Sequence, residues 1–379
     1  MKVLIVCNRL CYGGAERVGA TIANGLFGRG YEVYVVADLF MPVTYKLRPG
    51  IKVLNLYREG KGKYAKQLSS FKLLRSYLKQ YHPDVVIGIM WLASLRALVA
   101  ARGLHIPVIS TVHDSFERPA CAPMSRFEHF HKFVLNKLYN YVTVLTEADK
   151  KFIGSRLKHV TVMPNPLALT PVSFVADGRV ANPAGEETIK EPFVLAAGRL
   201  DDWHYKGFDL LIKAWSLVKE KKDSEGKYWH LKIAGKETPE SLDYLKGLCQ
   251  QYHVENSVEF LGFRADIAHL MQQASVFVLS SRYEGFGLVL IEAMSQGCAC
   301  VAADYKGRQK EIIGDSYNGI LCPTEDVHAL AEKMQYLISR SDERMQMQRN
   351  AVERSKLFAT ENIIDKWERM LSDVAHTNS

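Results

Sequence analysis

The feature that most constrains the fold is a repeated alternation of short β-branched runs with segments of helical periodicity. Parallel strands need long crossover connections, usually helices, so this alternation predicts an α/β fold with parallel sheets. In the first half the predicted strands are Val3–Val6, Glu32–Val36, Val85–Ile89, Val108–Thr111, Tyr141–Leu145 and Val160–Met163. In the second half they are Phe193–Ala197, Leu231–Ala234, Val258–Phe260, Val276–Leu279, Ala299–Ala302 and Ile320–Cys322.

A proline-containing segment separates the two series. Residues 164–192 contain five prolines and few periodic apolar positions, which favours irregular structure. The 379 residues also exceed the length of about 250–300 residues beyond which single cores rarely grow. We predict two doubly wound domains, over 1–170 and 193–360. A linker over 171–192 joins them, and a helix over 361–379 packs back on the first domain.

Composition excludes several classes of protein. The longest apolar run, Val85–Leu95, is much shorter than the roughly 20 residues that span a bilayer. Met1 and Lys2 lead directly into the first predicted strand, without the regions of a signal peptide. The cysteines match no zinc or disulfide spacing. We therefore expect a cytoplasmic protein.

Positive charge is concentrated in the first half of the chain. Residues 1–170 hold 24 Lys and Arg against 10 Asp and Glu, whereas residues 171–379 hold 25 against 31. A field of this sign suits an anionic surface or a phosphate-bearing ligand. No nucleic-acid-binding motif accompanies it, and we expect no nucleic-acid partner.

Part of this charge lies on one predicted helix over residues 64–81. Its apolar positions recur at helical spacing, and Lys72, Arg75 and Lys79 form a second stripe beside them. This basic edge is either the solvated border of a core-facing helix or a contact with anionic lipid headgroups or a membrane-borne acceptor.

Two glycines follow the first predicted strand. Gly13 and Gly14 precede a predicted helix, where exposed amides attract phosphate oxygens. A simple glycine turn explains them equally well. The Gly-x-Gly-x-x-Gly fingerprint of a dinucleotide site is absent.

The strongest signal is a glycine loop between a buried strand and a helix. Glu284 lies in this loop, which continues as Gly285-Phe286-Gly287-Leu288-Val289, and Glu292 lies inside the helix that follows. Two carboxylates about two turns apart, with helix-start amides between them, suit two hydroxyl clusters flanking a diphosphate. Alternatively, Glu284 is an ordinary acidic residue at a helix start, and Glu292 is a solvated residue on the surface.

Two cations follow the first strand of the second half. Arg199 comes directly after it, and Lys206 lies a short distance beyond. Open parallel sheets bind ligands at the carboxyl ends of their strands. An arginine fork beside a compact ammonium suits two adjoining phosphates, although isolated basic loop residues are usually solvated.

Together these motifs resemble one large enzyme family. The chain is similar to the retaining GT-B glycosyltransferases of family 4, and within it to bacterial enzymes that extend polyprenyl-diphosphate-linked glycans, O-antigens or capsules. The motifs are Gly13-Gly14-Ala15-Glu16-Arg17, Pro164-Asn165-Pro166, Gly198-Arg199-Leu200, Lys206-Gly207, Leu261-Gly262-Phe263 and Glu284 with Glu292. The resemblance implies two Rossmann-like domains facing across a cleft, with the nucleotide-sugar donor, expected to be UDP-linked, held mainly by the second domain.

The resemblance also implies roles for individual residues. Arg199 and Lys206 would hold the diphosphate, Glu292 the ribose and Glu284 the transferred sugar. His113 would lie near the reacting sugar and act with Glu284, Arg199 and Lys206 in catalysis. The other donor-binding positions would be Gly14, Asn165, Phe263, Gly285, Phe286, Gly287, Leu288 and Val289. His129 and His131 are interpreted as surface or packing residues.

The implied reaction is transfer of a hexose or N-acetylhexosamine to a glycan or polyprenyl-diphosphate-linked acceptor, at the inner face of a bacterial plasma membrane. The leaving diphosphate would take the acceptor proton. No Asp-x-Asp occurs in the chain, and we expect neither a metal nor another cofactor. Ala299, where the family usually has proline, and Lys306-Gly307, in place of a glycine pair, depart from the pattern and leave the bound base and sugar open.

Three other functions remain open at this point. A sugar-nucleotide epimerase of the same two-domain shape would need the donor site but no acceptor. A NAD-dependent oxidoreductase would explain paired sheets but lacks its glycine fingerprint. A non-catalytic binding protein would keep the fold without needing the Glu284 and Glu292 pair.

Overall fold

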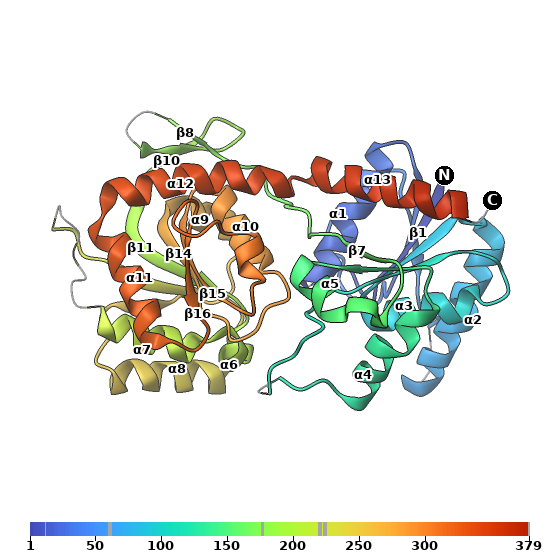
Figure 1. Ribbon diagram of the computed structural model, residues 1–379, viewed down its shortest axis with the longest axis horizontal. Coiled ribbons are helices and arrows are strands. Elements are labelled where there is room, and N and C mark those ends of the chain that lie inside the picture. Colours follow the sequence, from blue (N-terminus) through green and yellow to red (C-terminus); the bar gives the residue numbers. More distant parts are fainter. Residues whose placement is uncertain are drawn as a thin grey trace. The chain divides into compact units, whose positions relative to one another are not determined.

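The protein consists of two compact units, seen in a computed structural model that describes residues 1–11, 13–59, 63–120, 122–175, 178–218, 222 and 226–377 (Figure 1). The first unit comprises Met1–Arg118, Pro123–Ala168 and Phe358–Ser379. The second comprises Pro119–Ala122 and Leu169–Leu357. The main boundaries lie close to the predicted ones at 170 and 360.

The first unit is built on a seven-stranded sheet in which every neighbouring pair is parallel. The strand order is β3-β2-β1-β4-β5-β6-β7, with the winding reversed between β1 and β4. The strands are β1 (Lys2–Val6), β2 (Glu32–Ala37), β3 (Lys52–Asn55), β4 (Val85–Ile89), β5 (Val108–Thr111), β6 (Tyr141–Val144) and β7 (Val160–Val162). The helices are α1 (Gly14–Gly28), α2 (Lys63–Tyr81), α3 (Met90–Ala101), α4 (Arg126–Phe133), α5 (Glu147–Ile153) and α13 (Thr360–Thr377).

The second unit repeats this architecture with a six-stranded parallel sheet in the order β13-β12-β11-β14-β15-β16. The strands are β11 (Glu191–Ala197), β12 (His230–Ala234), β13 (Val258–Phe260), β14 (Ala274–Leu279), β15 (Ala299–Asp304) and β16 (Ile320–Pro323). The helices are α6 (Trp203–Lys206), α7 (Phe208–Leu217), α8 (Pro239–Gln251), α9 (Ile267–Gln273), α10 (Leu288–Ser295), α11 (Val327–Ser339) and α12 (Ser341–Ser355). Helices α7, α8 and α11 pack together, as do α9, α10 and α12.

The predicted fold class of two doubly wound α/β domains is confirmed. Every strand predicted from the sequence is present, with ends that differ by at most two residues. The prediction omitted β3, a short edge strand that has two exposed and two partly buried residues and therefore a weak apolar pattern. Among the described helices, none is long and apolar enough to cross a membrane.

The segment predicted as an irregular linker, 171–192, carries three short strands of the second unit instead. They are β8 (Ser173–Phe174), β9 (Val180–Ala181) and β10 (Glu187–Thr188), which form an antiparallel sheet. Val172, Val180 and Val352 form a small buried cluster, and Phe174 packs against it. Two-residue strands are too short to show a strand periodicity, so the sequence pattern could not reveal this sheet.

Helix α13 belongs to the first unit, although the chain reaches it from the second. Its apolar face is buried and includes Trp367. It packs along α1 (Figure 1), where Gly25 allows a close approach: a Cβ at this position would lie 2.4 Å from Cγ1 of Ile364. Arg29 at the end of α1 pairs with Asp365 at 2.5 Å. The first unit is therefore completed by the last helix of the chain.

Candidate functional site

The backbone at the carboxyl ends of β11, β12 and β13 is tightly packed. The amide of Gly235 donates to the carbonyl of Gly262 at 2.8 Å, and the amide of Gly198 donates to the carbonyl of Ala234 at 3.0 Å. A Cβ at Gly235 would lie 1.6 Å from the carbonyl oxygen of Gly198, so no other residue fits there. This edge is where a doubly wound sheet binds ligands.

Lys206 and Glu284 form an ion pair at this edge. The Nζ atom of Lys206 donates to Oε1 of Glu284 at 2.7 Å, and the Ser281 hydroxyl donates to the same oxygen at 2.9 Å. The exposed side-chain fractions are 27% and 15%, so the pair is partly shielded from water. The carbon chain of Lys206 passes beside Gly198 at the end of β11. The structure thus brings together two residues that lie 78 positions apart in the sequence.

Gly207 fixes the backbone beside this pair. It adopts φ +65°, and a Cβ there would lie 2.1 Å from the carbonyl oxygen of Ser280. The Ser280 hydroxyl donates to the carbonyl of Lys206 at 2.9 Å. Glycine is required for this contact, which holds the segment containing Lys206 against the loop that contains Glu284.

Arg199 is more exposed than Lys206, with 59% of its side chain accessible. Its guanidinium pairs with Asp202 in the short helical turn that follows and lies 3.8 Å from Asp201. The exposed N–H groups of this guanidinium can still turn toward a phosphate. A phosphate can compete with the aspartates because it accepts bidentate hydrogen bonds from arginine. Both predicted cations therefore lie at the end of β11, each beside a carboxylate.

The glycine loop ends at the start of α10. Gly287 is its N-cap, with φ +96°, and the first residues of the helix are Leu288 and Val289, both partly exposed. Gly285 and Phe286 are buried, and the carbonyl of Phe286 accepts a hydrogen bond from Gln309 at 3.3 Å. The amides at this helix start lie just beyond Glu284, as expected for an anion-binding terminus.

Two further residues that are predicted to bind the nucleotide-sugar donor have contrasting surroundings. Glu292 is on α10 and only 4% exposed, so it is not the solvated surface residue of the alternative interpretation. Phe263 follows β13 and is 71% exposed, which leaves a bare aromatic ring near the carboxyl edge of the sheet. Most of this ring is accessible to solvent, and an aromatic ligand group would bury it favourably.

Sequence reasoning missed Arg282. This buried side chain donates to both carboxylate oxygens of Asp209 at 2.7 Å and to the carbonyl of His204 at 2.6 Å. It joins the glycine loop to α6, which ends at Lys206, and to α7, which begins after Gly207. The position lies within the strongest motif, but no local pattern reveals a partner 73 residues away.

His113 and Asn165 meet in the first unit, beyond the carboxyl end of β5. The imidazole Nδ1 of His113 is 3.2 Å from Oδ1 of Asn165, and its Nε2 is 2.9 Å from the hydroxyl of Thr111. Burial lowers the pKa of His113 to about 4, although the hydrogen bond with Asn165 and the charge of Asp114 act in the opposite direction. The imidazole is therefore neutral at physiological pH.

Gly14 is the first residue of α1 and is exposed. A carboxylate already lies at this helix start, since Glu16 is in the first turn beside Gly13 and pairs with Arg9 at 3.3 Å. A negative charge at this terminus is favourable, because unpaired helix amides face it. The same amides are the feature from which phosphate binding was predicted.

Only two of the three residues in the basic stripe on α2 are exposed. Arg75 donates to the carbonyls of Ala100 and Arg102 at 2.8 and 2.7 Å, and so caps the end of α3. Lys72 and Lys79 are exposed. The stripe predicted from the sequence thus contains one structural arginine between two exposed lysines.

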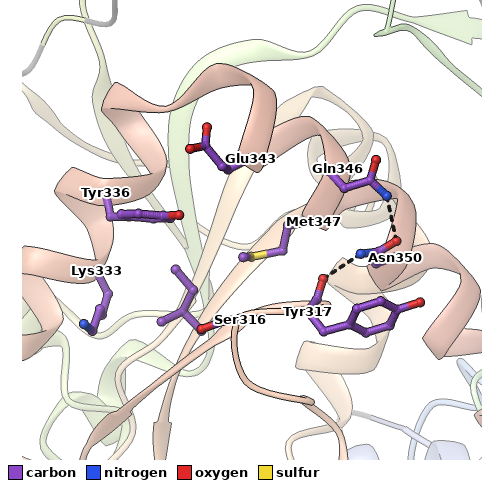
Figure 2. A pocket seen from close by; sticks show the side chains of 9 residues that line it. Ser316, Tyr317, Lys333, Tyr336, Glu343, Gln346, Met347 and Asn350 are labelled. Carbon is purple, nitrogen blue, oxygen red and sulfur yellow. Dashed lines mark hydrogen bonds between the residues drawn. The ribbon is translucent and has the colours of Figure 1, made fainter.

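A separate hollow lies in the second unit between α11, α12 and the loop before β16 (Figure 2). Asn350 on α12 donates to the carbonyl of Tyr317 at 2.8 Å, and Gln346 donates to Asn350 at 3.0 Å. Ile320, the first residue of β16, places this hollow at the amino edge of the parallel sheet. It is opposite to the edge with Arg199 and Lys206, and we do not assign the donor to it.

Comparison with known proteins identifies the family. Residues 182–354 match the family described as "Glycosyl transferases group 1", and residues 12–170 match "Glycosyltransferase Family 4". The chain belongs to glycosyltransferase family 4. It is a glycosyltransferase with the GT-B fold, as the sequence motifs predicted.

Three known proteins are similar to this chain. A Campylobacter jejuni enzyme named GalNAc-alpha-(1->4)-GalNAc-alpha-(1->3)-diNAcBac-PP-undecaprenol alpha-1,4-N-acetyl-D-galactosaminyltransferase is 27% identical over 99% of both chains. Sucrose-phosphate synthase from Thermosynechococcus elongatus has the same fold, with a TM-score of 0.81, 20% identity and 99% of each chain covered. HepE from Anabaena, solved in complex with UDP and glucose, gives a TM-score of 0.77 at 20% identity, covering 98% of this chain and 100% of HepE.

We expect His113 to remain neutral down to about pH 4, because burial disfavours the imidazolium. Histidine ¹H–¹⁵N spectra, with His113→Gln to assign the signal, measure this titration. In the unfolded chain the group has its ordinary pKa of 6.5, so the unfolded state binds the proton more tightly. The stability that this residue contributes should therefore fall as pH drops from 6.5 toward about 4. An imidazolium signal at about pH 6 in the folded protein contradicts this assignment.

Proposed function

We propose that this glycosyltransferase transfers a hexose or N-acetylhexosamine from a UDP-sugar to a polyprenyl-diphosphate-linked glycan, with retention of anomeric configuration and without a metal ion. The observation that carries the proposal is the convergence of Lys206, Glu284, Arg199 and the start of α10 at one edge of the second sheet. The acceptor class is supported by the name of the Campylobacter jejuni relative, and the UDP donor by the complexes of HepE.

The donor site has the charge layout that a sugar diphosphate needs. Arg199 and Lys206 bind the diphosphate, and the amides at the start of α10 bind phosphate or sugar oxygens. Glu284 accepts hydrogen bonds from the transferred sugar, and Glu292 binds the ribose. Gly14 is a further residue that we propose for the diphosphate. Two remaining positions of the donor site are Phe263, which borders the base, and Asn165, which holds His113.

The chemical step requires positioning and stabilisation of charge. As the acceptor hydroxyl attacks, the bond from the anomeric carbon to the diphosphate breaks, and the leaving diphosphate takes the hydroxyl proton on the same face of the sugar. Arg199, Lys206 and the helix amides stabilise the negative charge that develops on the diphosphate. His113 enters this step as a neutral hydrogen-bonding group rather than as a general base, since its pKa is about 4.

We propose that the reaction is independent of metal because of the same two cations, Arg199 and Lys206. The two cations at the end of β11 can neutralise the leaving group without a divalent ion. No group of three or more His, Cys, Asp or Glu residues suited to a metal ion occurs in the described part of the chain.

We further propose that the protein acts at the cytoplasmic face of the membrane, where such an acceptor lies. The first half carries the excess positive charge, and Lys72 and Lys79 present ammonium groups on the surface of α2. Each cation near an anionic leaflet contributes about 1 kcal/mol to binding.

A transfer assay with UDP-sugars and an undecaprenyl-diphosphate-linked oligosaccharide tests the reaction itself. We expect α-linked product from an α-linked donor, identified by its anomeric NMR coupling, at a rate that EDTA leaves unchanged. Product of inverted configuration, or transfer restored only by manganese or magnesium, contradicts the proposal. Donor incubated alone is the control, since isomerised nucleotide sugar would indicate an epimerase.

The Arg199→Ala and Lys206→Ala substitutions should each lower kcat by about 100-fold or more, the scale of losing one electrostatic contact to a developing anion. Rates are measured at saturating donor, and circular dichroism checks folding. Arg340→Ala is the matched control, because Arg340 is an exposed cation of the same unit outside the site. Wild-type rates in both variants would remove the assignment of the diphosphate site.

The double substitution Lys72→Glu, Lys79→Glu should weaken sedimentation with phosphatidylglycerol vesicles by about tenfold or more, because two attractive charges become repulsive. Arg75 is left unchanged, since it caps α3. UDP binding should be unaffected. The variant with arginine at both positions is the control and should bind vesicles normally. If the glutamate variant sediments as well as the wild type, α2 is a core-facing helix with a solvated edge.

A further inference from the structure

Glu237 follows β12 at the carboxyl edge of the second sheet, and one oxygen of its carboxylate is buried without a partner. This oxygen, Oε2, has no hydrogen-bond partner among the described residues. The other oxygen, Oε1, lies 3.4 Å from the position that a Cβ of Gly262 would occupy. A buried polar atom without a partner costs free energy, and native structures seldom keep one without a reason. A ligand that supplies an N–H group would recover this cost.

The strand order places Glu237 between two residues of the proposed donor site. Phe263 follows β13, Glu237 follows β12 and Arg199 follows β11, and these three strands are neighbours in the sheet. Neighbouring strands are about 4.8 Å apart, so Glu237 lies one strand from Arg199 and one strand from Phe263. A nucleotide sugar that lies along this edge, with its diphosphate at Arg199, brings its base to Glu237 and Phe263.

The backbone on both sides of Glu237 is fixed. The amide of Gly235, two residues before it, donates to the carbonyl of Gly262 at 2.8 Å. Thr238, the next residue, is the N-cap of α8, and its hydroxyl accepts a hydrogen bond from the amide of Ser241. The last torsion of a glutamate side chain is soft and roughly two-fold. The carboxylate can therefore turn toward a ligand while the backbone stays in place.

No ion pair within the described part of the chain explains the position of Glu237. The cation that follows Phe263 is Arg264, and its guanidinium donates to both carboxylate oxygens of Asp266 at 2.8 and 2.6 Å. This arginine is thus already paired with another carboxylate. The lack of a partner within the protein supports a role for Glu237 in binding a ligand.

We propose that Glu237 accepts a hydrogen bond from the N3–H group of uracil and thereby selects the base of the donor. The inference rests on the proposed transfer from a UDP-sugar and adds to it the residue that selects the base. A carboxylate accepts hydrogen bonds and donates none, so it favours a base with an N–H group at this edge. Cytosine has a lone pair at N3, which a carboxylate repels. The ring of Phe263, which is 71% exposed, covers the face of the same base.

Calorimetry on the full chain tests this contact with UDP and with 3-methyluridine diphosphate, in which a methyl group replaces the N3 hydrogen. We expect the wild type to bind UDP about tenfold or more tightly than the methylated nucleotide, because a hydrogen bond to a charged group is lost. Glu237→Ala should raise the Kd of UDP by about tenfold and remove the preference, since the carboxylate is gone and the methyl group has space. Glu237→Gln keeps an acceptor oxygen and should keep most of the preference.

The matched control is Glu240→Ala. Glu240 is an exposed carboxylate in the first turn of α8, three residues beyond Glu237. This variant should keep the wild-type Kd for UDP and the wild-type preference. GDP is the competitor to include, because guanine also presents N–H groups, at N1 and N2. Tighter binding of GDP than of UDP by the wild type would overturn the choice of uracil.

Thermal unfolding and kinetics separate this role from a structural one. Removing a polar atom that is buried without a partner relieves a cost, so Glu237→Ala should have a Tm at or above the wild-type value without nucleotide. Saturating UDP should then raise this Tm by less than in the wild type. In the transfer assay the donor KM should rise by about tenfold while kcat stays nearly unchanged, because the base is remote from the bond that breaks. A lowered Tm with an unchanged Kd for UDP would make Glu237 a structural residue.

Two further results would overturn the inference: equal Kd values of UDP and 3-methyluridine diphosphate for the wild type, or an unchanged preference in Glu237→Ala. Neither result contradicts the proposed reaction, which stands if product forms from a UDP-sugar. Conversely, the expected preference for UDP without transfer from any UDP-sugar would refute the reaction and leave the base site standing.

Discussion

The proposed donor site depends on how closely the backbone segments approach one another at the carboxyl edge of the second sheet. Gly235 lies against the carbonyl of Gly198, and Gly207 lies against the carbonyl of Ser280, at distances that exclude any Cβ. The second contact fixes the backbone directly after Lys206, and its ammonium consequently meets Glu284 at 2.7 Å. Buried Arg282 reinforces the same junction through Asp209. The electrostatics of the site thus follow from a packing constraint on glycine, and a rigid backbone lets charged groups act without reorganising.

The two units have the same fold, but the charges at the carboxyl edges of their sheets are arranged differently. At the edge of the second sheet, Arg199 is largely exposed and Lys206 partly so, and the amides of α10 add further positive character. In the first unit, the charges beside His113 cancel within one network that includes the almost fully buried Lys132. The first arrangement favours an anion, which supports the proposal that the second unit binds the donor.

Much of the fold could be predicted because parallel strands that are buried on both faces appear in the sequence as continuous runs of apolar residues. Strands such as Val85–Ile89 are continuous apolar runs, and the structure places them as predicted. Elements without such apolar runs were missed. They are the edge strand β3 and the two-residue strands β8, β9 and β10. The glycine loop before α10 was also found, since glycines at fixed spacing are visible locally. Arg282 with Asp209, and the network around Lys132, depend on residues brought together by folding, and no local spacing reveals them.

The protonation state of His113 links the first unit to the proposed chemistry. An imidazole with a pKa of about 4 is a weak base at physiological pH, and Thr111 and Asn165 already lie at its two ring nitrogens. It is therefore poorly suited to remove a proton from the acceptor hydroxyl. The carboxylates Asp114 and Glu128 are each paired with two cations, and, although burial opposes it, the charges of Lys132 and Arg118 hold the pKa of Asp114 below its ordinary value. In the proposed reaction the base is the departing diphosphate itself. Its proton affinity rises as the glycosidic bond breaks, so proton transfer and bond cleavage assist each other, and the cations of the second unit need only stabilise the charge that remains.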